Sequence, residues 1–194
     1  DVFILGFLKF LFPVCFFWLF LLLGSVDIQH FTNRKQILKN YIPMTYKVVE
    51  EKGERHKELV PAIHNLIFVH SSMDTITELK SSNMLLSALR YITHKSVVTK
   101  DSAQEVITVP ANQMNNFIKA TKNHEEDVTY LNCENNLPLI GERVRITEGA
   151  FFGVEGIIKR IQKNKRVIVC INHISSVMLN FVPKSCMEKI GEHL

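Results

Sequence analysis

The chain opens with an apolar segment, and beyond it hydrophobic and polar residues alternate between turn signals. From Phe10 to Val26 no residue is charged, a length close to the ~20 residues that span a bilayer. Lys9 and Pro13 interrupt the segment and weaken a transmembrane interpretation, and no clear cleavage site follows it. Residues 1–17 therefore form an apolar leader for which three interpretations stay open: an altered start, an extension of a strand, or a membrane anchor.

The next stretch carries signals typical of a β-hairpin. Residues 41–49 favour a strand because apolar and β-branched side chains predominate. A charged segment from Glu50 to Glu58 follows, in which Gly53 can adopt the positive φ of a turn. Residues 59–61 and 66–69 then return to a β pattern. This order predicts a hairpin or ribbon.

Two helices are predicted after the hairpin. The first begins at Ser71 or Ser72 and runs to about Lys80, and the second opens with Pro110. Three apolar residues of the second helix recur at helical spacing and are expected to face a sheet: Met114, Phe117 and Ile118. Further strands are expected over 85–93 and 106–109. Because helices and strands interleave, the expected fold class is α+β, with an α/β sandwich in this first domain.

A polar stretch separates this domain from a β-rich C-terminal part. It is rich in Asn and acidic residues and is interpreted as a linker over 123–138. Beyond it, short β-branched runs predict the strands of a small barrel: 144–146, 154–161, 166–171 and 175–182. The predicted organisation is a leader, a sandwich domain, a linker and a barrel domain: 1–17, 18–122, 123–138 and 139–194.

Composition and motifs argue against chemistry of the protein's own. The net charge of +4 permits a nucleic-acid or acidic partner without requiring one. The four Cys include no C-x-x-C pair, so the sequence gives no sign of a zinc ribbon. No phosphate-binding loop, G-x-S-x-G or H-E-x-x-H motif is present, and His64 and His70 lack ligands at metal spacing. A protein that is not an enzyme and holds no cofactor or metal is predicted.

The segment from Gly141 to Ile161 resembles the KOW motif of NusG-type transcription factors. It reads G-x-x-V-x-I, then a glycine-bounded turn around an aromatic residue, then a basic β-branched strand, with Ala150 where the motif usually has Pro. Glycine permits the tight turn and the aromatic ring anchors it. The predicted KOW loop consists of Gly149, Phe151, Gly153 and Gly156. The resemblance implies an SH3-like barrel.

Three earlier segments resemble the NGN domain of the same family. They are Tyr41-Ile-Pro-Met44, Val60 to His70, and Val109-Pro-Ala-Asn-Gln-Met114. In detail the chain looks most similar to the UpxY-like antiterminators of Bacteroides-type bacteria, which serve surface (capsular) polysaccharide operons. The resemblance places the family's Trp-led first strand at Trp18–Leu23 and its first helix at Asp27–Lys39.

The resemblance implies a cytoplasmic, monomeric factor that binds RNA polymerase and suppresses pausing and termination. Alternation puts Leu66 and Phe68 on one face of a strand, and that face is either an outer apolar patch or core. In the family this strand contacts the polymerase clamp coiled coil, so Leu66 and Phe68 are the expected binding residues, bordered by Tyr41 and Met44. A weaker second polymerase contact is expected at Thr75 and Thr77.

The barrel is expected to recruit a ribosomal protein or a termination factor. A basic run without acidic neighbours is a further candidate for a nucleic-acid or ribosomal contact: Lys159, Arg160, Lys163, Lys165 and Arg166. No aromatic residue interleaves this run, so base stacking is not supported by the sequence. Two rival functions stay open, a ribosome- or RNA-binding KOW protein without a polymerase role and a membrane-anchored regulator.

Overall fold

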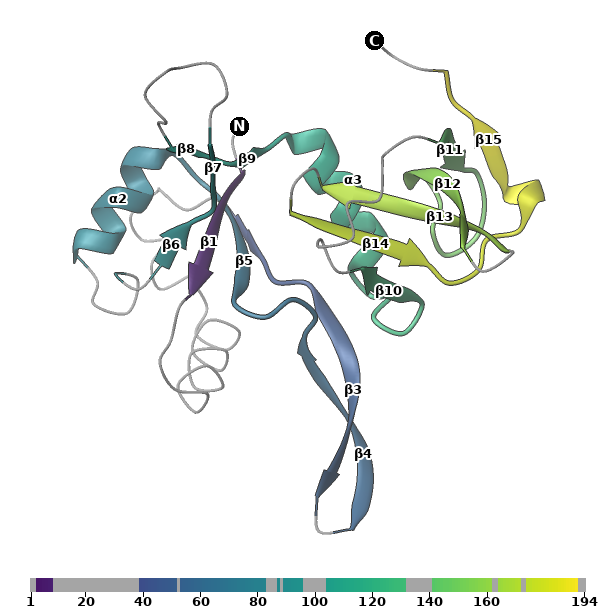
Figure 1. Ribbon diagram of the computed structural model, residues 1–194, viewed down its shortest axis with the longest axis horizontal. Helices are drawn as coiled ribbons and strands as arrows, with labels where there is room; N and C mark the ends of the chain where they lie inside the picture. The colour runs from purple at the N-terminus through teal and green to yellow at the C-terminus, as the bar shows by residue number, and fades with distance from the viewer. Residues whose placement is uncertain are drawn as a thin grey trace. The chain divides into compact units, whose positions relative to one another are not determined.

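The structure divides into two compact units, each built from two separate segments of the chain. The computed structural model describes residues 3–8, 39–51, 53–82, 87, 89–95, 104–131, 141–161, 164–171 and 174–191. The first unit comprises Asp1–Ile42 and His64–Ala111, and the second comprises Pro43–Ile63 and Asn112–Leu194. The described residues form antiparallel strands and two α-helices, so the mixed α and β composition is as predicted (Figure 1).

An antiparallel sheet forms the centre of the first unit. Its strands lie in the order β2 (Lys39–Tyr41), β5 (Leu66–His70), β1 (Phe3–Leu8) and β6 (Leu89–Tyr91), with β9 (Thr108–Val109) also paired to β1. Strand β5 is therefore an interior strand, hydrogen-bonded to β2 on one edge and to β1 on the other. A separate pair joins β7 (Thr93–Lys95) to β8 (Gln104–Val106).

The position of β1 differs from the expectation at the start of the chain. Residues 1–17 had no expected place in the domain, yet Phe3–Leu8 pairs with three other strands (Figure 1). A short run of apolar residues without charges suits such an interior strand. The alternative first strand at Trp18–Leu23 lies outside the described residues. So does the helix expected over Asp27–Lys39, except for Lys39 itself, which begins β2.

Helix α2 (Met73–Ser82) confirms the first predicted helix. The Thr75 backbone N–H donates to the Ser72 hydroxyl at 3.2 Å, so Ser72 satisfies a donor that the first turn leaves free. Asp74 lies in the first turn and Lys80 in the last, which complements the helix dipole. Ile76 is buried, so this amphipathic helix contributes to the core of the first unit.

The predicted hairpin is present in the second unit. Strands β3 (Met44–Glu51) and β4 (Glu54–Pro61) pair in register along their whole length, and Gly53 has a φ of 86° at the turn. The two strands form a sheet of their own and pair with no other described strand. Most of the described residues between Tyr46 and Leu59 are exposed to solvent.

Helix α3 (Ala111–Thr121) confirms the second predicted helix and the role of Pro110 before its first residue. Met114 and Phe117 are fully buried as expected, whereas Ile118 is only half-buried. Thr121 is also buried, and its hydroxyl donates to the Phe117 carbonyl at 2.7 Å. One apolar stripe thus anchors the helix in the second unit.

A six-stranded antiparallel sheet makes up most of the second unit. Its order is β10 (Val128–Leu131), β14 (Ser175–Leu179), β13 (Asn164–Ile171), β12 (Glu155–Ile161), β11 (Glu142–Ile146) and β15 (Met187–Lys189). A 3-10 turn, η4 (Lys184–Cys186), leads into β15. The buried side chains are mostly β-branched, as the strand predictions required: Val144, Ile146, Val154, Val167, Ile168, Val169, Ile171 and Val177.

The linker expected over 123–138 is wrong in its central part. Val128–Leu131 forms strand β10, pairs with β14 at one edge of the sheet, and buries Val128. Acidic and amide residues around this strand make the stretch look like a linker, but an edge strand needs only one apolar face. The remaining residues 132–140 lie outside the described part of the chain.

Candidate functional site

The two residues expected to form an outer apolar patch are core residues. Leu66 is 4% exposed and Phe68 is 0% exposed, so the sequence-based expectation of an exposed strip at these positions is wrong. Ile67 on the opposite face is also buried, and Val69 is half-buried. Leu66 and Phe68 lie on one face of β5 and Ile67 on the other, so their burial puts both faces of this strand in the core of the first unit.

The residues expected to border that patch have partly structural roles. Tyr41 is half-buried, and its ring lies 6.5 Å from the ring of Phe68 within the first unit. Met44 is half-buried in the second unit, where its carbonyl accepts a hydrogen bond from the Tyr130 hydroxyl at 3.4 Å. Neither residue is part of an exposed patch on β5.

The second expected polymerase contact uses its hydroxyls inside helix α2. The Thr75 hydroxyl lies 2.8 Å from the Ser72 hydroxyl, and the Thr77 hydroxyl donates to the Met73 carbonyl at 2.9 Å. These bonds are the local side-chain contacts that Ser and Thr make in the first turns of a helix. Thr77 is exposed, so its methyl group is still available to a partner.

An exposed apolar strip lies instead on the hairpin, where the sequence analysis did not place one. Tyr46, Val48 and Leu59 are 44%, 60% and 41% exposed, and Tyr46 lies directly opposite Leu59 in the register. Residues two apart on a strand share a face, so Tyr46 and Val48 point to the same side of β3. We call Tyr46, Val48 and Leu59 the hairpin strip. The signal in the sequence is alternation within a ribbon that has no third strand to cover it.

The base of the hairpin is held against residues 125–130 of the same unit. The Lys57 ammonium forms a 2.7 Å ion pair with Glu126, and the Thr45 hydroxyl donates to the Glu125 carbonyl at 3.5 Å. The hydrogen bond from Lys57 to Glu126, helped by the attraction between the two charges, raises the pKa of Lys57. These contacts fix the base of the ribbon.

The loop expected from the resemblance to the KOW motif has the geometry that its glycines predict. Gly149 and Gly153 have φ values of 84° and 75°, a region that L side chains rarely adopt. Phe151 is buried, with its ring 4.7 Å from His124, whereas the neighbouring Phe152 is 70% exposed. Gly156 serves a different purpose, since an added Cβ there would lie 2.5 Å from a Val167 methyl carbon.

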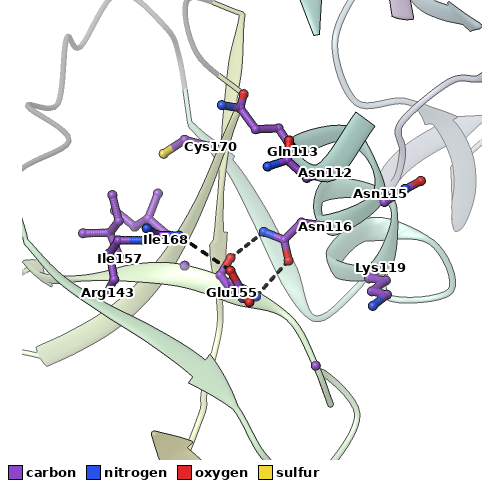
Figure 2. A pocket seen from close by; sticks show the side chains of 12 residues that line it. Asn112, Gln113, Asn115, Asn116, Lys119, Arg143, Glu155, Ile157, Ile168 and Cys170 are labelled. Atoms are coloured by element: carbon purple, nitrogen blue, oxygen red, sulfur yellow. Dashed lines mark hydrogen bonds and ion pairs between the residues drawn. The ribbon is translucent and has the colours of Figure 1, made fainter. Parts of the chain in front are cut away.

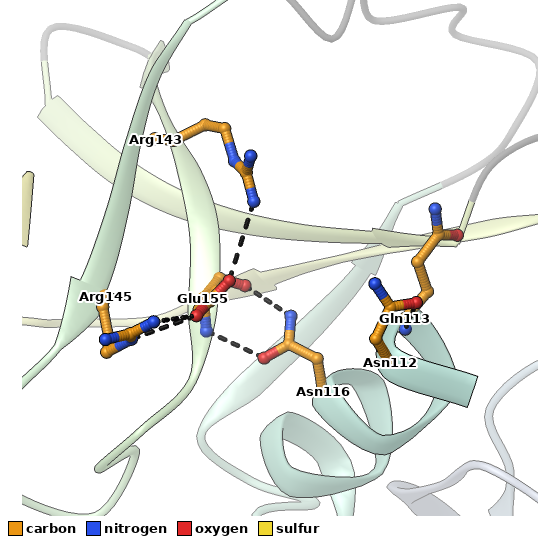
Figure 3. Close-up of polar contacts among 6 residues, drawn as sticks. All are labelled: Asn112, Gln113, Asn116, Arg143, Arg145 and Glu155. Carbon is orange, nitrogen blue, oxygen red and sulfur yellow. Dashed lines mark hydrogen bonds and ion pairs between the residues drawn. The ribbon is translucent and has the colours of Figure 1, made fainter. Parts of the chain in front are cut away.

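A polar cluster joins α3 to the sheet of the second unit around Glu155 (Figure 3). The Asn116 side chain donates to the Glu155 carbonyl at 2.6 Å and accepts from the Glu155 backbone N–H at 2.8 Å. The Glu155 carboxylate accepts from Arg145 at 2.7 Å and 3.0 Å and lies 3.6 Å from Arg143. The bond to Glu155 raises the pKa of Arg145.

The same cluster forms one wall of a polar cavity of about 380 Å³ (Figure 2). Amide side chains from α3 line one side, and Ile157, Ile168 and Cys170 line the other. The side-chain oxygen of Gln113 is buried there without a hydrogen-bond partner among the described residues. The cavity offers amide and guanidinium groups, which can hold a polar ligand, and its lining also includes the Cys170 thiol and the Lys119 ammonium.

The basic run lies on two paired strands. Arg160 faces Lys165 across the β12–β13 pair, and Lys159 faces Arg166 on the adjacent rung. Lys163 lies outside the described residues. The structure therefore gathers four of the five expected cations on neighbouring strands.

The described residues contain neither a candidate metal site nor a helix that could span a membrane. No group of three or more His, Cys, Asp or Glu side chains in this part of the chain could hold a metal ion. None of the helices found among the same residues is long and apolar enough to cross a membrane. Comparison of the sequence with family models and with curated proteins finds no match. Function therefore has to be argued from the motifs and from the surfaces described above.

Proposed function

We propose that the protein is a NusG-type transcription elongation and antitermination factor that binds RNA polymerase and catalyses no reaction itself. What supports this most is the segment 141–161, which resembles the KOW motif and forms two antiparallel strands joined by a turn with positive-φ glycines. The resembling NGN segments fall on the hairpin, on β5 and on the start of α3, in the family's order. A cytoplasmic role at surface polysaccharide operons follows from the resemblance.

The hairpin strip is the polymerase-binding surface in this proposal, in place of Leu66 and Phe68. Exposed apolar side chains on a ribbon without a covering layer mark a site for a protein partner. Met44 lies two residues before Tyr46, so it extends the same face toward the base of the ribbon. In this proposal the hairpin strip contacts the surface of the polymerase clamp coiled coil, the partner that the family resemblance implies.

Binding would act on transcription by shifting a conformational equilibrium. A factor that binds the closed, elongating clamp better than the paused state increases the population of the former. A difference of about 1–3 kcal/mol between the two affinities is the usual size of a coupling free energy and shortens pauses about 5- to 150-fold. The second unit would at the same time carry a site for a ribosomal protein or a termination factor, for which the exposed Phe152 is a candidate.

Co-purification with core RNA polymerase tests the proposal. The full chain is expected to co-elute with polymerase. The double variant Tyr46→Ser, Leu59→Ser is expected to bind about 30-fold more weakly, since two interface residues that contribute about 1 kcal/mol each together contribute about 2 kcal/mol. Both residues are exposed, so the variant is expected to fold. Phe152→Ser is the matched control, because it removes an exposed aromatic ring from another element. Failure of the unsubstituted chain to co-elute contradicts the proposal.

A further inference from the structure

The second unit contains an open groove that the sequence analysis did not predict. It has a volume of about 1080 Å³ and is bounded by β11, β12, β13, β15 and the segment between β14 and η4. Apolar side chains such as Ile158, Phe181 and Met187 line part of it. Its volume is at the upper end of the range of about 300–1,000 Å³ typical of small-molecule sites, and it is open to solvent. We call it the basic groove, for the charges described next.

Positive charge is concentrated around the basic groove. Five cationic residues line it: Arg160, Lys165, Arg166, Lys184 and Lys189. Among the described residues that line it, Glu142 is the only acidic one, and it forms an ion pair with Lys189. The lining therefore has a formal charge of five minus one, or +4, which equals the net charge of the whole chain. Such a surface attracts polyanions.

Cationic residues face one another across the paired strands β12 and β13, an arrangement that destabilises the sheet. Arg160 and Lys165 lie directly opposite on paired strands, and Lys159 and Arg166 form the next rung. Like charges directly opposite in a sheet are destabilising. No described carboxylate forms an ion pair with Arg160, Lys165 or Arg166. An anionic ligand would relieve this repulsion.

The structure also supplies the aromatic side chain that the basic run itself lacks. Phe181 is 76% exposed and lies in the groove lining with Arg160 and Lys165, although it follows them by at least 16 residues in the chain. An exposed ring beside cations is the arrangement on which single-stranded nucleic acids bind, with bases stacked on the ring and phosphates on the cations. In a duplex the bases are already stacked and cannot reach such a ring.

We propose that the basic groove binds single-stranded nucleic acid, with a base stacked on Phe181 and phosphates held by Arg160 and Lys165. An acidic peptide would satisfy the charges, but it gives no reason for an exposed phenyl ring at this place. The inference does not depend on polymerase binding, because the hairpin strip and the basic groove share no residue. RNA and single-stranded DNA present the same phosphates and bases, so the experiment has to distinguish them.

The test is fluorescence anisotropy of the full chain with labelled oligouridylate and oligothymidylate of about 12 nucleotides, within the range of about 4–16 that a small barrel covers. Binding is expected to weaken with salt, with a slope of log K against log salt of about −0.7 for each phosphate contact. Phe181→Ala is expected to lose about 5- to 150-fold in affinity, from the known effect of removing one stacking ring. Arg160→Gln is expected to make the salt slope smaller by about 0.7.

Matched controls lie in the same unit. Phe152→Ala removes an equally exposed ring outside the groove, and Lys47→Gln removes an exposed cation on the hairpin. Both are expected to bind like the unsubstituted chain. Tighter binding of the RNA assigns the groove to a transcript and tighter binding of the DNA assigns it to a displaced strand, and either supports the inference.

Three results would overturn the inference. They are equal binding of a duplex and a single strand, unchanged affinity of Phe181→Ala, and polyglutamate binding tighter than that of either oligonucleotide. The last result would assign the groove to an acidic peptide. Polymerase co-elution is a separate readout, so an unsubstituted chain that co-elutes with polymerase but binds neither oligonucleotide refutes this inference alone.

Discussion

The substitution Phe68→Ala tests whether Phe68 stabilises the core, as its burial indicates, or binds polymerase, as the sequence predicted. Phe68 has no exposed surface and lies on the interior strand β5, with its ring 6.5 Å from that of Tyr41. Truncating a buried Phe to Ala costs about 3–5 kcal/mol, because apolar contacts are lost and a cavity remains. For a chain of this size each kcal/mol lowers the melting temperature by about 2–4 °C, so a decrease of about 6–20 °C is expected.

Two measurements locate the effect. Urea unfolding followed by circular dichroism gives the change in the free energy of unfolding. Hydrogen exchange then shows where protection is lost, and the loss is expected in β5 and its neighbours β2 and β1. Phe181→Ala is the matched control, because it truncates an exposed Phe and should change stability by less than about 0.5 kcal/mol.

One result would refute this reasoning. If Phe68→Ala unfolds at the same urea concentration as the unsubstituted chain but no longer co-elutes with polymerase, Phe68 is a docking residue and its burial is relieved in solution. The opposite pair of results, lower stability of Phe68→Ala and loss of co-elution only in the hairpin-strip variant, supports the assignment made from the structure.

Three further predictions concern the second unit. Asn116→Ala removes two hydrogen bonds to the β12 backbone and is expected to cost about 1–3 kcal/mol in urea unfolding, whereas the exposed Asn115→Ala should be neutral. Gly156→Ala is expected to destabilise the fold more than Gly149→Ala. The Cβ added at Gly156 would lie 2.5 Å from a Val167 methyl carbon, whereas the Cβ added at Gly149 meets no atom and costs only backbone strain of about 1–2 kcal/mol. The reverse order of melting temperatures contradicts this prediction. The raised pKa of Lys57 means that its ion pair stabilises the fold fully below pH 10.5 and loses this effect as the pH rises through the folded-state pKa. In NMR titrations the midpoint of Lys57 should fall in the variant Glu126→Gln.

Local signals predicted the elements whose causes lie within a few residues. Ser72 and Pro110 mark the starts of α2 and α3, and the glycines of the KOW loop mark a turn, because capping and backbone conformation are local properties. The hairpin was predicted for the same reason, since alternation and Gly53 are sufficient to define it.

The features that the sequence did not predict depend on contacts between distant residues. Leu66 and Phe68 belong to a sheet built from distant segments, since β1, a neighbour of β5, lies about 60 residues away in the chain. The spacing of residues within β5 therefore cannot show that they are buried. The hydrogen bonds between Asn116 and Glu155 join residues that are 39 positions apart. Phe181 lies near the basic run only because the chain returns past that sheet after β14. Pairwise spacing cannot show any of these three.

Two charged clusters in the second unit differ in how completely their groups are paired, and this difference separates structure from function. Both backbone groups of Glu155 bond to Asn116, and its carboxylate lies against two arginines, so the charges of this cluster are paired within the unit and stabilise it. Around the basic groove, by contrast, Arg160 and Lys165 oppose each other without a described carboxylate partner, and a phenyl ring stands in solvent beside them. Natural chains violate local rules of this kind mainly where they bind something. The unpaired cluster is therefore the one in which substitutions should change binding more than stability.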